Sequence, residues 1–191
     1  MRDAWRRLAR VGTVAGLAAL AAVSAPRPAA TGGMPGPDLS RVRVLAVAPF
    51  LNEDPPTRWL TAAAADRLAV LLRRAPFQVL GPVAVSAAMA SEGVTPADLI
   101  SPSRSIALAR RLGADAILTG RVVRLEQGRV GRLRVGEDGD DAKAAIDFRV
   151  LDVATRLKLF EEEIGCAGSP LASEALDCVV RLLAARLLGP R

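Results

Sequence analysis

The two cysteines are the residues whose type most directly suggests chemistry in this sequence. Cys166 and Cys178 are its only cysteines and lie twelve positions apart. In an oxidising compartment such a pair can form a disulfide. A helix that begins at Pro170 would carry Cys178 about 12 Å along its axis, so the chain must fold back before the Cα atoms come within bonding range. The alternative is a buried thiol at Cys178 and an incidental Cys166.

The composition removes the commonest catalytic and metal-binding groups. The chain has 191 residues with no histidine and no tyrosine, and histidine is the most frequent general base and metal ligand. This excludes Ser-His-Asp triads and zinc sites that use histidine, although enzymes without histidine exist. Because no other catalytic constellation is found and two cysteines without histidine make a poor metal site, we expect no catalytic residues, no metal and no cofactor. The sequence therefore predicts a protein that is not an enzyme. A hydrolase of unrecognised type would need a deep pocket lined by several polar groups.

An arginine cluster offers a candidate contact surface for an anionic partner. Guanidinium groups match the geometry of phosphate and carboxylate groups, so the cluster could contact anionic lipid, lipopolysaccharide or an acidic protein. The alternative is a solvated strand face in a chain whose 26 basic residues include only two lysines. Nucleic acid is not an expected partner, because no aromatic residues that could stack on bases interleave with the arginines. The cluster comprises Arg121, Arg124, Arg129, Arg132 and Arg134.

Two acidic stretches are better explained by local structure than by ligand binding. Asn52, Glu53 and Asp54 follow the first predicted strand, where open α/β sheets often bind ligands. Without a base partner, a phosphate-binding loop or a set of metal ligands, we interpret them as loop and helix-cap residues. The run Glu137 to Asp141 lacks the ligand spacing of an EF-hand, so we interpret it as a solvated turn.

The stretch from Leu112 to Gly120 indicates a helix end, a tight turn and a buried strand. Gly113 suits the left-handed position that ends a helix. Ala116 to Leu118 is apolar on both faces, as in a strand covered on both sides, and Gly120 would let another part of the chain approach closely. A second apolar strand is predicted from Val42 to Ala48, at the centre of the sheet.

The other predicted elements alternate along the chain and indicate an α/β fold with a mixed parallel and antiparallel sheet of about five strands flanked by helices. Caps at Thr95-Pro96, Ser101-Pro102 and Ser169-Pro170 open helices. The elements are a helix over 57–74, a strand over 77–80, a helix from 83 to 93, two short helices before 112, a hairpin over 146–159 and a C-terminal helix.

The N-terminal segment has the outline of a secretory signal. Basic residues from Arg2 to Arg10 precede an apolar stretch, Val11 to Val23, which is shorter than the ~20 residues of a membrane-spanning helix. We expect a signal peptide at residues 1–25, a Pro/Gly/Ala-rich linker at 26–40 and a single α/β domain at 41–191. The alternative is an uncleaved leader that anchors the chain in the inner membrane.

Four blocks of sequence together resemble the TolB amino-terminal, CsgG and LpoB-like group of bacterial envelope domains. The blocks are Val47 to Phe50, Phe77 to Leu80, Leu112 to Gly120 and Leu151 to Thr155. The chain departs from the group at Arg156, where a turn glycine is usual. It also lacks the lipidated cysteine of CsgG- and LpoB-like members.

The resemblance implies a periplasmic domain that works by binding other envelope proteins and has no catalytic residues. We therefore expect a non-enzymatic, exported protein-binding module that assists assembly or regulation of cell-envelope components. The alternative is a lipid-binding or small-ligand-binding envelope domain that uses the arginine cluster. The sequence does not indicate an oligomeric state.

Overall fold

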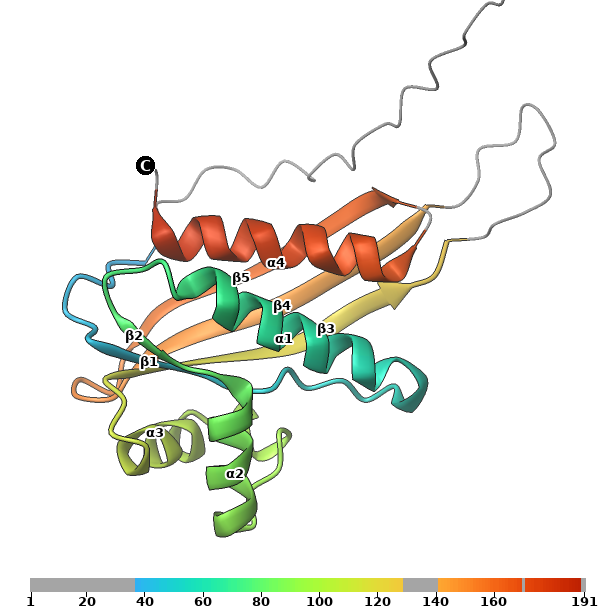
Figure 1. Cartoon of the computed structure of the whole chain (residues 1–191). Coiled ribbons are helices and arrows are strands. Elements are labelled where there is room, and N and C mark those ends of the chain that lie inside the picture. Colours follow the sequence, from blue (N-terminus) through green and yellow to red (C-terminus); the bar gives the residue numbers. More distant parts are fainter. Residues whose placement is uncertain (1–36, 129–140, 170, 190–191) are drawn as a thin grey trace, which may run out of the picture.

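A five-stranded mixed β-sheet forms the centre of the structure, in the strand order β2-β1-β3-β4-β5 (Figure 1). β1 is parallel to both β2 and β3, whereas β3 pairs antiparallel with β4 and β4 pairs antiparallel with β5. The predicted fold class is therefore confirmed, and β1 occupies the interior position expected of an apolar strand. The strands are β1 (Val44–Val47), β2 (Gln78–Leu80), β3 (Ala116–Glu126), β4 (Ala142–Asp152) and β5 (Lys158–Ser169).

This computed structural model describes residues 37–128, 141–169 and 171–189. The predicted signal peptide, residues 1–25, lies outside the described residues, as do residues 26–36 of the predicted linker and most of the acidic run from Glu137 to Asp141. Leu39 and Val42 are buried in the core, so residues near the predicted start of the domain already pack against it. None of the helices in the described part of the chain is long and apolar enough to cross a membrane.

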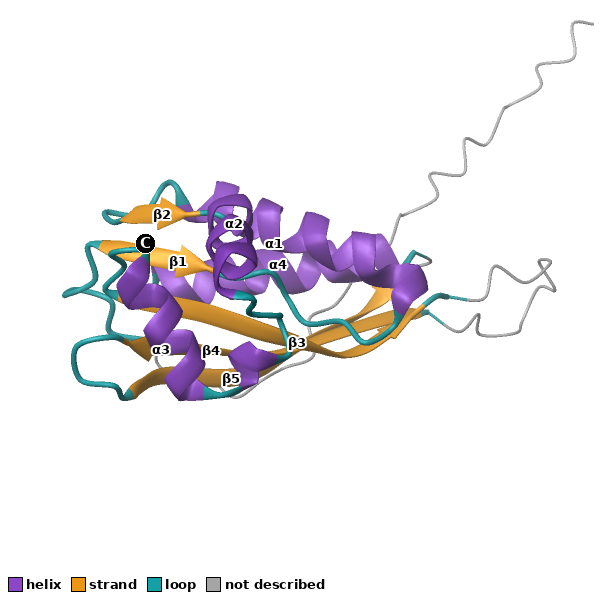
Figure 2. Ribbon diagram, turned by 90° about the horizontal axis from the view of Figure 1, so that it is seen from below, coloured by secondary structure: helices purple, strands orange, loops and turns teal. Residues whose placement is uncertain are grey.

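Helices cover the two faces of the sheet unequally (Figures 1 and 2). α1 and α4 pack side by side on one face, over the larger apolar core, which includes Leu68, Ile146 and Leu183. α2, α3 and a 3₁₀ helix, η2, lie on the other face and enclose a smaller core around Ile117. The helices are η1 (Pro55–Thr57), α1 (Arg58–Leu72), α2 (Pro82–Glu92), η2 (Asp98–Ile100), α3 (Pro102–Arg111) and α4 (Ala172–Leu188).

The two glycines of the central stretch act as predicted. Gly113 has φ +67° and follows α3 at the turn into β3. Gly120 lies against the buried ring of Phe50: a Cβ atom added to this glycine would come 2.8 Å from Phe50 Cδ1 and 3.2 Å from Ile146 Cγ2. Leu51 N–H donates to Gly120 C=O at 2.8 Å, so this close approach also fixes the loop that follows β1.

Some predicted boundaries were wrong. β4 and β5 extend well beyond the predicted hairpin, and the capped Thr95-Pro96 segment leads into only one turn of 3₁₀ helix. The last helix begins two residues after Pro170, although Ser169 Oγ contacts Leu171 N and the Glu174 carboxylate near its start. Arg156, in place of the usual turn glycine, has a left-handed φ of 62°, a conformation that costs a residue with a Cβ atom about 1 kcal/mol.

The turn before η2 is held by a reciprocal pair, Thr95 and Asp98. Thr95 Oγ1 and Thr95 N–H donate to Asp98 Oδ2 at 2.6 and 2.8 Å, and these two bonds hold the pKa of Asp98 below its ordinary value. Because the folded state lowers the pKa, the stabilisation is present above the pKa of the unfolded chain, about pH 4, and is lost as the pH falls through the folded value.

We expect Asp98→Asn to flatten the fall in Tm on acidification below about pH 4, as measured by thermal unfolding at a series of pH values. Asp66→Asn on α1 removes the same charge at another exposed position and serves as the matched control. An unchanged acid dependence in Asp98→Asn would contradict the role given to this turn.

Candidate functional site

The part of the sheet that the helices leave uncovered carries charged side chains from three strands. It lies on the α2–α3 side of β3, β4 and β5, beyond η2 (Figure 2). Alternation along the strands places Arg121, Asp147, Glu161 and Glu163 on this side, and the pairing register sets Arg121, Asp147 and Glu163 in one row across the three strands. We call these four residues and the strands beneath them the open sheet face.

A small cavity of about 150 Å³ separates the open sheet face from the segment that precedes α3. Its apolar wall comes from the loop after β1 and from η2, and its polar wall comes from the strands. The lining residues are Pro49, Leu51, Pro96, Leu99, Ile100, Thr119, Gly120, Arg121, Asp147, Phe148, Arg149 and Glu161. The volume admits a single side chain or a small polar group, and is much smaller than an ordinary cofactor pocket.

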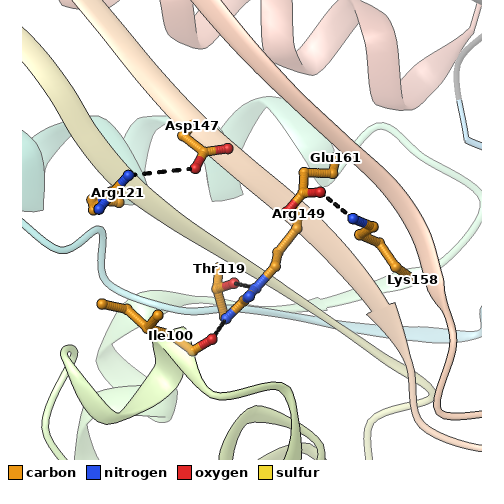
Figure 3. A network of polar contacts seen from close by, with 7 residues as sticks. All are labelled: Ile100, Thr119, Arg121, Asp147, Arg149, Lys158 and Glu161. Carbon is orange, nitrogen blue, oxygen red and sulfur yellow. Dashed lines mark hydrogen bonds and ion pairs between the residues drawn. The ribbon is translucent and has the colours of Figure 1, made fainter.

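Arg149 ties η2 to the sheet at one end of this cavity (Figure 3). Its Nε donates to Thr119 Oγ1 at 3.2 Å, and its Nη2 donates to the backbone carbonyls of Leu99, at 2.6 Å, and Ile100. The guanidinium therefore satisfies carbonyls at a helical segment whose own hydrogen bonds are few. Arg149 therefore positions the wall of the cavity, and three of its five N–H donors are used within the protein.

We expect Arg149→Met to lower the free energy of unfolding by about 1–3 kcal/mol, because it removes charge-assisted hydrogen bonds and takes the guanidinium donor from Ile100 C=O. Leu99 C=O keeps the Ser105 hydroxyl, which donates to it at 2.7 Å. Urea denaturation measures the loss, and faster amide exchange at Leu99 and Ile100 would locate it. Arg121→Met is the matched control, since its exposed ion pair is worth well under about 1 kcal/mol. Equal losses in the two variants would contradict the assignment.

Two ion pairs lie on the open sheet face, one between β3 and β4 and the other within β5. An Arg121 nitrogen lies 4.0 Å from Asp147 Oδ2, and Lys158 Nζ contacts Glu161 Oε2 (Figure 3). The side chains of all four are 40–50% exposed, so both pairs are weak and open to exchange with charges on a partner. Glu163 lies beside them in the register and is exposed.

The predicted arginine cluster is only partly within the described residues. Arg121 pairs with Asp147, and Arg124 lies 3.5 Å from Glu126, so these two guanidinium groups stand beside carboxylates on β3 and β4. Arg129, Arg132 and Arg134 lie outside the described residues. Two of the five predicted residues, Arg121 and Arg124, thus lie on β3. Each has an acidic neighbour that was not predicted from the sequence.

The polar residues after β1 organise their own loop. Asn52 Nδ2 donates to Thr57 Oγ1 at 2.9 Å, Asn52 Oδ1 accepts from Asp54 N–H at 2.9 Å, and Thr57 Oγ1 donates to Asp54 Oδ2 at 2.8 Å. Asp54 and Thr57 occupy the N-cap positions of η1 and α1, without a side-chain bond to the helix N–H groups. A second, shallow cavity lies between this loop and Arg121 to Leu125.

The structure joins Cys166 of β5 to Cys178 of α4 through a disulfide, with the Cα atoms 6.1 Å apart. The required reversal of the chain occurs after Ser169. Cys166 lies three residues back along the strand, about 10 Å, and Cys178 lies six residues into the helix, about 9 Å, so the two positions coincide. Formation of this bond in the exported protein remains a prediction.

In the described residues, no three Cys, Asp or Glu side chains gather as a metal site would need.

Sequence reasoning missed Arg149, Thr119, Glu161 and Glu163 as parts of one surface. The alternation of Asp147 and Arg149 with apolar residues indicated a hairpin with one solvated face, and this signal was available. It did not show that η2, about fifty residues earlier in the sequence, would lie over that face and accept hydrogen bonds from Arg149.

Comparison with solved structures shows the fold. The chain is similar to lipoprotein GNA1162 from Neisseria meningitidis, with a TM-score of 0.52 and 22% identity, over 74% of this chain and 97% of that one. It also matches PelC from Paraburkholderia phytofirmans, with a TM-score of 0.47 and 18% identity, over 83% and 96% of the two chains. For the LpoB C-terminal domain from Salmonella enterica the values are 0.38 and 16%, over 71% and 86%.

No family model matches the chain, and no curated protein matches it in sequence. The fold expected from the four sequence blocks is confirmed by the likeness of fold to lipoprotein GNA1162.

Proposed function

We propose that this chain is a non-enzymatic module of the bacterial cell envelope that binds another envelope protein through the open sheet face. In this proposal the leader at residues 1–25 exports it to the periplasm, and the domain from about residue 41 does the binding. The observation that carries the proposal is the open sheet face itself, where exposed charges stand in register across three strands beside a cavity the size of a side chain.

The geometry of this surface suits protein recognition. A sheet fixes the spacing of its side chains, so the surface is ordered before a partner arrives and little entropy is lost on binding. Weak, exposed ion pairs such as that of Arg121 with Asp147 can be exchanged for pairs with a partner, which favours specificity over affinity. The fold likeness to a Neisseria lipoprotein agrees with an envelope location.

Site-specific crosslinking in the cells that make the protein tests this proposal. A photoreactive amino acid in place of Glu163 should capture another envelope protein, whereas the same amino acid at Arg181, on the outer side of α4, should capture little. Both positions are exposed, so solvent access is matched. No adduct at Glu163, or equal adducts at both positions, would contradict binding through this face.

The second candidate, a lipid-binding domain, receives less support from the described residues, because Arg121 and Arg124 each stand beside a carboxylate. Flotation of the purified chain with vesicles separates the candidates. Binding that requires phosphatidylglycerol, weakens with salt and is lost on Arg121→Gln with Arg124→Gln would favour the lipid-binding candidate.

A further inference from the structure

β5 is a long strand at the edge of the sheet. It runs from Lys158 to Ser169 and pairs on one side with β4; in the described residues no strand pairs with its other side (Figures 1 and 2). A strand of twelve residues offers several unpaired backbone N–H and C=O groups along such an edge, and these groups can pair with an extended segment of another chain.

The hydrogen-bonding pattern shows which residues of β5 point their backbone groups outward. The carbonyls of Leu118 and Gly120 accept hydrogen bonds from the chain at and just after β1, so the backbone groups of these two β3 residues point toward β1. Those of the intervening Thr119 point the other way, toward its partner Arg149 on β4. The alternation of antiparallel pairing then directs Phe148 and Ile146 of β4 toward β5. It leaves the N–H and C=O groups of Glu161, Glu163, Gly165 and Ala167 facing the free edge.

The same alternation places the outward-facing residues of β5 on one side of the sheet. Their side chains lie on the α2–α3 side, where Glu161 and Glu163 are exposed and are followed by the small residues Gly165 and Ala167. The free backbone groups therefore coincide with two carboxylates at alternate positions. A segment paired here would set its own side chains about 5 Å from these carboxylates, where opposite charges stabilise and like charges destabilise.

We infer that the β5 edge accepts an extended segment of a partner protein that carries Arg or Lys at two alternate positions, opposite Glu161 and Glu163. This inference rests on the proposed function and names the chemistry of the partner. Gly165 and Ala167 leave room for larger partner side chains further along the strand. Lys158, which contacts Glu161 in the free chain, would be displaced by the incoming cation.

The competing explanation is that the carboxylates only guard an exposed edge against self-association, as charges on edge strands often do. The two explanations differ in what a matched basic peptide does. Carboxylates that only prevent self-association would bind neither a basic nor an acidic strand. A docking edge would bind a basic strand and not an acidic one, and this preference would reverse when the charges of the edge are reversed.

The test uses the purified, disulfide-bonded chain and two labelled peptides of about nine residues, one with Arg and one with Glu at alternate positions, and with Thr and Val between. Fluorescence anisotropy should show binding of the Arg peptide only. Reversal of both carboxylates, Glu161→Lys with Glu163→Lys, should weaken the Arg peptide about tenfold or more and should confer binding of the Glu peptide. The matched control reverses Glu53 and Asp66, exposed carboxylates on other parts of the surface, and should leave the affinity unchanged.

A backbone readout separates strand pairing from loose charge attraction. On addition of the Arg peptide, amide exchange should slow at Glu161, Glu163, Gly165 and Ala167 and stay unchanged at the inward-facing Glu162 and Ile164. Gly165→Pro removes one outward N–H and should weaken binding while the ladder with β4 remains. Ala167→Pro repeats the test should the first variant unfold.

Absence of binding by the Arg peptide, or equal loss in the control reversal, would overturn the inference. An unaltered exchange pattern at the four outward amides would also overturn it. The crosslinking at Glu163 tests the proposed function separately. If Glu163 forms an adduct in cells but the Arg peptide does not bind, the proposed function is retained and only the inference about a basic partner strand is rejected.

Discussion

Gly120→Val is expected to lower the free energy of unfolding by about 3 kcal/mol, because the added atoms have no room. A Cβ atom at this position would already lie 2.8 Å from Phe50 Cδ1 and 3.2 Å from Ile146 Cγ2. Phe50 is only 4% exposed, so its ring cannot swing into solvent without losing its burial, and either the ring or the strand must move. Urea denaturation monitored by circular dichroism measures the effect.

The matched control is Gly165→Val, at a glycine of β5 that has room for a side chain. A Cβ atom there would meet its nearest neighbours, Ala144 O and Ala145 Cβ, at 3.5 and 3.6 Å, which are ordinary contacts. A β-branched residue in an edge strand is expected to change stability by less than about 0.5 kcal/mol. Similar losses in the two variants would show that the contact with Phe50 is not the cause.

The Gly120 contact also affects the proposed binding surface. Leu51 donates to Gly120 C=O and accepts from Val122 N–H at 2.8 and 2.9 Å, and both Leu51 and Gly120 line the small cavity. Displacement of Phe50 would therefore move a wall of the cavity along with the core. Folded Gly120→Ala protein should show altered amide chemical shifts at Leu51 and Thr119, which report on this wall.

Removal of the disulfide is the second large effect. Replacement of both Cys166 and Cys178 by alanine should lower the free energy of unfolding by about 3 kcal/mol, since the bond closes a loop of twelve residues between β5 and α4 in the unfolded chain. Both cysteines are buried, so reduction of the folded protein should be slow and should speed up as the chain unfolds.

Thermal unfolding with and without a thiol reductant measures this effect. The wild-type protein should lose stability on reduction, and the double alanine variant should be insensitive to the reductant, which makes it the control for side effects of the reagent. Equal Tm values for oxidised and reduced wild-type protein would contradict a stabilising disulfide in the exported chain.

Much of the fold follows from local signals in the sequence. The apolar run Ala116 to Leu118 and the glycines on either side of it predicted a buried strand entered from a helix end, because side-chain period and glycine conformation act over a few residues. The same holds for α1, α3 and β1. One boundary that was wrong, the start of α4, coincides with a tertiary contact, since Ala172 N–H donates to Gln127 Oε1 at 3.3 Å.

A charged residue on the covered side of β5 explains why the full length of this strand was not predicted. Glu161 to Glu163 breaks the expected alternation, since Glu162 points to the α4 side although it is charged. Glu162 forms an ion pair with Arg186 of α4, whose Nη2 lies 3.0 Å from Glu162 Oε1. The side chains of Arg186 and Glu162 are only 22% and 10% exposed. A buried carboxylate is tolerated when paired in this way, and its partner is too distant in sequence to be seen in a local pattern.

The sequence by itself determined the α/β class, the central strands, the glycine turn and the two cysteines as the only disulfide candidates, because these depend on residue type and short-range spacing. Only the tertiary structure decided which charges meet: Arg149 with the carbonyls of η2, Arg121 with Asp147, and the carboxylates of β5 with a free edge. Those neighbours are set by strand order and by register, and side-chain contacts across a sheet depend on both. The candidate site therefore belongs to the folded chain and to no single segment of it.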